Sequence, residues 1–147
     1  MSETNAQVFV VDDDLSIREA LESLLRSAGL SVQTFSSAQD FLAPGRADMP
    51  SCLVLDVQMP GLNGLDLQSE LIAAHNQIPI IFITGHGDIP TSVRAIKAGA
   101  LEFLTKPIDN EDLLNAVRQG IARARKARQH QDLVERNFEE IVGASGG

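Results

Sequence analysis

The chain lacks tryptophan and tyrosine, and its 147 residues include a single cysteine. A lone Cys52 cannot form an internal disulfide bond, and its position inside a short apolar run predicts a buried, unreactive side chain. No apolar run approaches the roughly 18 residues of a membrane span, and the polar first residues do not resemble a secretion signal. We therefore expect a cytoplasmic protein.

Basic residues are also scarce, because 12 Lys and Arg face 20 Asp and Glu, for a net charge of −8. This balance argues against nonspecific binding of the folded body to nucleic acid or to an anionic membrane. A chain of this length buries about two thirds of its unfolded surface, which is enough for one hydrophobic core. We expect one domain with an appendage.

Short apolar runs alternate with helical patterns and predict five βα units. The expected strands are residues 8–11, 31–35, 52–55, 80–83 and 101–105. The third and fourth runs are apolar without alternation, which is typical of strands covered by helices on both faces. The fold class is therefore α/β: a doubly wound five-stranded parallel sheet of order 2-1-3-4-5, which is a flavodoxin-like topology.

The first expected helix begins at Leu15 and carries two different N-terminal signals. Ser16 and Glu19 fit the spacing of a capping box. Asp14, which directly precedes the helix, is expected to act as its N-cap because short polar side chains favour that position.

Polar side chains follow four of the expected strands at the point where each strand ends. These residues are Asp12 and Asp13, Asp56, Thr84, and Lys106. In an open parallel sheet the carboxyl ends of the strands share one edge, and ligands bind where the strand order reverses. The sequence therefore predicts an acidic cluster, a hydroxyl and an ammonium group at a single site.

The acidic cluster of Asp12, Asp13 and Asp56 predicts a metal site. Neighbouring carboxylates repel one another unless a cation is present. Oxygen ligands suit Mg²⁺ better than Zn²⁺, for which the sequence has no set of His and Cys ligands. A carboxylate such as Asp56 can attack phosphorus, and the metal, Lys106 and Thr84 can stabilise the phosphoryl oxygens.

Several separated motifs carry a family resemblance that covers Gln7 to about Ala124. They are V-V-D-D-D, L-D-V-Q-M-P-G-L-N-G, I-T-G-H-G-D-I-P, K-A-G-A and F-L-T-K-P. Together and in this order they resemble the receiver domain of bacterial two-component response regulators. The I-T-G-H-G-D-I-P segment is most similar to receivers of the FixJ-like and NtrC-like groups.

The resemblance implies a chemical role for each site residue. Asp56 would accept a phosphoryl group from a sensor histidine kinase, with Thr84 and Lys106 assisting. Asp13 would bind Mg²⁺ directly, Asp12 largely through water, and the backbone carbonyl of Gln58 would be a further ligand.

The resemblance also implies how the signal leaves the site. Thr84 and Phe103 would form a switch pair, and the Lys106-Pro107 step is similar to a cis peptide of the family. Activation would promote a homodimer through the fourth helix and fifth strand, near Arg94, Lys97, Ala98 and Glu102, with the tail helix as an additional contact.

The expected organisation is a phosphoacceptor receiver domain at residues 1–124 and a helical linker or tail at 125–147. The tail would lead toward an output domain absent from this sequence, through which alone DNA would be bound. The chain would not be an enzyme in the ordinary sense, beyond autophosphorylation from small phosphodonors and autodephosphorylation. It would relay phosphorylation to a transcriptional output.

Three other functions compete with this interpretation. A phosphatase of the haloacid-dehalogenase type needs a general acid two residues after its aspartate, where Gln58 cannot serve. A flavodoxin-type electron carrier must cradle phosphate after the first strand, where three aspartates would repel it. The alternative kept open is a pseudo-receiver that signals through protein contacts without phosphorylation.

Overall fold

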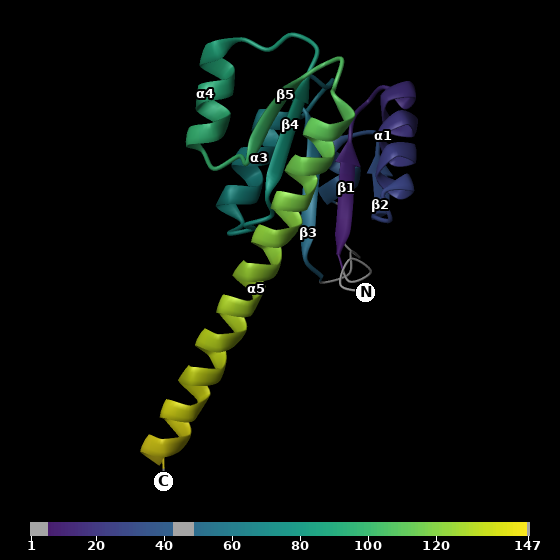
Figure 1. Ribbon diagram of the computed structural model, residues 1–147. Coiled ribbons are helices and arrows are strands. Elements are labelled where there is room, and N and C mark those ends of the chain that lie inside the picture. The colour runs from purple at the N-terminus through teal and green to yellow at the C-terminus, as the bar shows by residue number, and fades with distance from the viewer. Residues whose placement is uncertain (1–5, 43–48, 147) are drawn as a thin grey trace.

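Five short apolar segments form one parallel sheet in the computed structural model, which describes residues 6–42 and 49–146 (Figure 1). The strands are β1 (Gln7–Val11), β2 (Ser31–Phe35), β3 (Ser51–Asp56), β4 (Ile80–Thr84) and β5 (Glu102–Thr105). Their order is β2-β1-β3-β4-β5, as the sequence predicts, and all four pairings are parallel. The order reverses between β1 and β3, so these two strands lie side by side.

Helices cover both faces of the sheet. They are α1 (Leu15–Ser27), α2 (Ala38–Leu42), α3 (Gly64–Ala73), α4 (Ile89–Lys97) and α5 (Asn110–Gly146). Val8 and Val10 of β1 point into the core beneath α1 and α5, whereas Phe9 and Val11 point into the core beneath α2, α3 and α4. This two-sided burial explains the uninterrupted apolar sequence of the central strands.

The N-terminus of α1 settles which of the two capping signals is used. The Asp14 carboxylate accepts hydrogen bonds from the backbone N–H groups of Ser16 at 2.8 Å and Ile17 at 3.3 Å. The N-cap prediction for Asp14 is therefore confirmed, and the capping box predicted for Ser16 and Glu19 is wrong. Ser16 lies inside the helix, and the Asp14 carboxylate also complements the positive end of the helix dipole.

Helix α5 runs closely over β3 and then extends past the sheet (Figure 1). A Cβ atom at Gly120 would lie 2.6 Å from the Cys52 sulfur, so only glycine permits this approach. Cys52 is fully buried, as the sequence predicts, and burial raises the pKa of its thiol to about 12. Within residues 6–42 and 49–146, no helix has the length and apolar character to cross a membrane.

Candidate functional site

The strand register brings the polar strand ends together at one edge of the sheet. Val11 of β1 pairs with Leu55 of β3, so the residues that follow them, Asp12 and Asp56, are neighbours. On the other side of β3, Thr84 ends β4, and its carbonyl accepts a hydrogen bond from the backbone N–H of Lys106 at 2.7 Å. Residues from four strands therefore meet in one place.

A single ammonium group bridges the two most buried carboxylates. Lys106 Nζ lies 3.0 Å from Asp12 Oδ2 and 3.7 Å from Asp56 Oδ1. Asp12 is fully buried, and its other oxygen accepts the backbone N–H of Asp14 at 2.9 Å. Asp12 is thus held in place from two sides, whereas Asp56 has the longer and weaker contact with Lys106.

The pKa of the Asp56 carboxyl group is raised by its surroundings. Burial raises its pKa from 3.8 to about 6, with a further increase from the charge of Asp12, while Lys106 acts in the opposite direction. The residue is only 4% exposed. At neutral pH Asp56 is therefore ionised, but the charged form is held in an unfavourable environment that a further cation would relieve.

The same carboxylates form a set of ligands suited to a hard cation. Asp12, Asp13 and Asp56 each offer one oxygen, and these three oxygens lie within 4.8 Å of one another. All are carboxylate oxygens, which suit Mg²⁺. The backbone N–H of Gln58 donates to Asp56 Oδ1 at 3.4 Å, so the backbone of Gln58 lies beside the cluster. The donor set therefore fits a magnesium ion.

Thr84 and Phe103 lie on the adjacent strands β4 and β5, and Thr84 follows Ile83, the partner of Asp56 in the sheet. Thr84 is 1% exposed, and its hydroxyl accepts the backbone N–H of His86 at 3.2 Å. Phe103 is half-buried, and its ring centroid lies 6.0 Å from that of Phe82. The peptide bond between Lys106 and Pro107 is cis.

Sequence reasoning missed one residue that supports the cluster. Arg18 of α1 donates from Nη1 to the backbone carbonyl of Asp12 at 2.7 Å, which braces the turn between β1 and α1. Its position one helical turn after Asp14 could have indicated a side chain directed back toward the end of β1.

An edge with an acidic cluster, a buried threonine and a lysine on neighbouring parallel strands is the arrangement of a signalling receiver domain. Residues 8–118 match the response regulator receiver domain family. The chain belongs to that family, whose members act in phosphorylation-based signalling.

Individual relatives support the same assignment. The chain is 54% identical to nodulation protein W of Bradyrhizobium diazoefficiens over 131 residues, covering 89% of this chain and 58% of that protein. It is 47% identical to response regulator protein TodT of Pseudomonas putida over 144 residues, covering 96% and 63%. The solved structure of response regulator StyR is similar with a TM-score of 0.81 and 53% identity, covering 92% and 70%. The chain thus spans about six tenths of the length of these two curated relatives.

Proposed function

We propose that this chain is the phosphoacceptor part of a transcriptional response regulator and that Asp56 accepts a phosphoryl group from a sensor histidine kinase. The observation that carries the proposal is the position of Asp56, which lies in the acidic cluster and 3.7 Å from Lys106 Nζ. A relative named as a response regulator supports the kinase as donor, and one named as a transcriptional regulatory protein supports transcription as output.

In the proposed reaction a carboxylate oxygen of Asp56 attacks the phosphorus of a phosphohistidine. A P–O bond forms while the P–N bond breaks, and the electron pair of that bond leaves with the imidazole. Lys106 would stabilise one phosphoryl oxygen and the Thr84 hydroxyl another, because charge spreads over the equatorial oxygens in the transition state.

The residues that would hold Mg²⁺ are Asp12, Asp13, Asp56 and the backbone carbonyl of Gln58. When bound, the ion would supply positive charge to the third phosphoryl oxygen and offset the repulsion among the carboxylates. Asp13 is the exposed member of the cluster. Mg²⁺ usually keeps several of its water ligands in a protein site, so an exposed carboxylate is well suited to coordinate it directly.

We assign the transmission of the signal to Thr84 and Phe103. The Thr84 hydroxyl now accepts from the His86 backbone, so it must exchange this bond for one to a phosphoryl oxygen on Asp56. Phe103 would then rotate toward the space that Thr84 leaves. Such coupling works only if the phosphoryl group interacts differently with the two arrangements.

The proposed output is a dimer through α4 and β5. Helix α4 exposes three apolar side chains at positions that share one face, namely Ile89, Val93 and Ile96. Exposed apolar side chains that cluster on one helix face are typical of an interaction surface. Helix α4 also exposes two basic side chains, Arg94 and Lys97, and the exposed Ala98 follows them.

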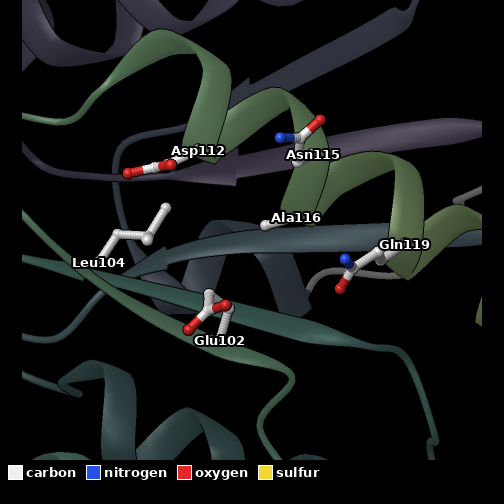
Figure 2. A pocket seen from close by; sticks show the side chains of 6 residues that line it. All are labelled: Glu102, Leu104, Asp112, Asn115, Ala116 and Gln119. Atoms are coloured by element: carbon white, nitrogen blue, oxygen red, sulfur yellow. The ribbon is translucent and has the colours of Figure 1, made fainter.

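Acidic side chains lie on β5, the strand beside α4, and on α5. Figure 2 shows Glu102 of β5 and Asp112 of α5 at an open pocket between these two elements. In a two-fold dimer the basic residues of one copy can meet the carboxylates of the other. Each exposed pair is worth only about 0–1 kcal/mol, so these pairs would set the register more than the affinity.

The domain organisation remains a proposal as well. We assign residues 1–124 to the receiver domain and residues 125–147 to a helical linker or tail; the side chains after Gln129 lie outside the described residues. Sedimentation of the full chain and of a chain ending at Ala124, each with and without beryllofluoride, separates the α4–β5 contribution from the tail. If the shorter chain stays monomeric when activated, the α4–β5 dimer is wrong.

The decisive experiment is incubation with acetyl phosphate and Mg²⁺, followed by intact-mass measurement. We expect one added phosphoryl group, which is lost in Asp56→Asn and in excess chelator. An unmodified mass with Mg²⁺ present would favour a pseudo-receiver that signals without phosphorylation. Equal labelling of Asp56→Asn would show that another residue is the acceptor.

A further inference from the structure

The loop between β4 and α4 passes directly over Thr84 and Phe103 at Gly87. A Cβ atom at this position would lie 3.1 Å from Thr84 Cγ2 and 3.2 Å from Phe103 Cε1. It would also lie 3.6 Å from Thr105 Oγ1. Carbon atoms in favourable contact are about 3.5–4.0 Å apart, so even one methyl group would crowd both side chains at once.

The backbone conformation does not explain why position 87 is glycine. Among the described residues, the glycines with positive φ are Gly29, Gly61 and Gly99, and Gly87 is not one of them. An ordinary L-residue could therefore adopt the backbone angles of this position. The constraint comes from the space above Thr84 and Phe103.

We propose that Gly87 is a positioning residue of the switch. Because it has no side chain, it leaves Thr84 and Phe103 the room to change their side-chain conformations. This inference rests on the proposed function. To turn its hydroxyl toward Asp56, Thr84 must give up the His86 bond and rotate to another staggered conformation, which swings its methyl group. The Thr84 methyl group and the Phe103 ring both face the space beside Gly87, so a side chain there obstructs the rotation of both residues.

The test is Gly87→Ala in the full chain, activated with beryllofluoride and Mg²⁺. Fluorine NMR reports occupancy of the Asp56 site, and sedimentation at saturation reports the dimer dissociation constant. We expect normal occupancy with activation-dependent dimerisation weakened by at least about tenfold, a size typical of coupling between sites. The ¹³C shift of the Thr84 methyl group is expected to change on activation of the parent chain and to stay at its unactivated value in Gly87→Ala.

The chain offers a matched control in the same loop. Gly85 also lacks a positive φ, and a Cβ atom there would have nothing within 4 Å. Gly85→Ala stiffens the same loop by the same substitution but adds no contact. At saturating beryllofluoride, the Gly85→Ala variant should have the same dimer dissociation constant as the parent chain.

Gly87 lies on the exposed surface of the loop, so the alanine variant is expected to fold. If it is unstable, adding Phe103→Leu and Thr84→Ser, which together remove Phe103 Cε1 and Thr84 Cγ2, should restore stability. Failure of that rescue overturns the proposal, because the crowding would then have another cause.

The remaining outcomes separate this inference from the proposed function. Parent-like dimerisation of activated Gly87→Ala, with a normal parent and an uncoupled Thr84→Ala, overturns the role of Gly87 alone. Dimerisation of Gly87→Ala without beryllofluoride also overturns it, since filling the space would then favour the switched state. If the parent chain neither binds beryllofluoride nor dimerises with it, the proposed function itself fails.

Discussion

Replacing Asp56 by Asn should stabilise the metal-free protein, even though it removes the proposed phosphoacceptor. The ionised Asp56 carboxylate is buried beside Asp12, and these two effects raise its pKa to about 6 despite the ammonium of Lys106. Burying the Asp56 carboxylate on folding therefore costs free energy at neutral pH, where Asp56 is charged in both the folded and the unfolded chain. An amide of nearly the same shape avoids this cost.

The size of the effect follows from the pKa. The difference between 3.8 and about 6 corresponds to roughly 3 kcal/mol, at about 1.4 kcal/mol per pKa unit. Because the neighbouring Asp13 is exposed, water reaches the mouth of the site and screens part of this cost. We expect a gain of about 2 kcal/mol at pH 7.5, or roughly 8 °C in melting temperature for a domain of this size.

The direction of the pH dependence is also determined. Between pH 3.8 and about 6 the folded chain holds a proton on Asp56 that the unfolded chain has released, so this group makes stability fall as pH rises. The advantage of Asp56→Asn should therefore be complete above the folded pKa of about 6 and should shrink as pH falls toward 3.8.

Thermal unfolding followed by far-UV circular dichroism in excess chelator is the appropriate assay, because the chain has no Trp or Tyr for fluorescence. Glu70→Gln, which removes an exposed carboxylate from α3, is the matched control and should change stability little at pH 7.5. If Asp56→Asn is no more stable than the parent at pH 7.5, or if its advantage grows toward pH 4, the electrostatic reasoning is wrong.

Three further outcomes are expected. Gly120→Ala should destabilise the chain by about 1–3 kcal/mol in thermal unfolding, because its Cβ would lie 2.6 Å from the Cys52 sulfur. Cys52→Ala should offset part of that loss in a double-mutant cycle, and strict additivity would contradict the contact. Asp13→Asn should abolish the heat of Mg²⁺ binding in calorimetry at millimolar metal, whereas an unchanged titration would exclude Asp13 as a ligand. Thr84→Ala should accept a phosphoryl group, by intact mass, but should dimerise on activation at least about fivefold more weakly than the parent; equal dimerisation would refute the proposed coupling.

Local sequence patterns were sufficient for the topology of the sheet and for the place of the site. Strands buried on both faces must be apolar throughout, so residues 52–55 and 80–83 could be recognised without a structure. Since parallel strands end at one edge, the first polar residue after each run was enough to collect Asp56 and Lys106 into one site. The same local reasoning was ambiguous at α1, where two capping signals overlapped and only Asp14 is used.

The sequence by itself therefore determined the α/β fold, its strand order and the residues that meet at the carboxyl edge of the sheet. Only the tertiary structure decided that Lys106 lies nearer to Asp12 than to Asp56 and that the pKa of Asp56 is raised. It also revealed the close approaches of Gly87 to Phe103 and of Gly120 to Cys52. These properties depend on distances between residues far apart in the chain, and such distances are set by how helices and loops pack on the sheet rather than by any local pattern.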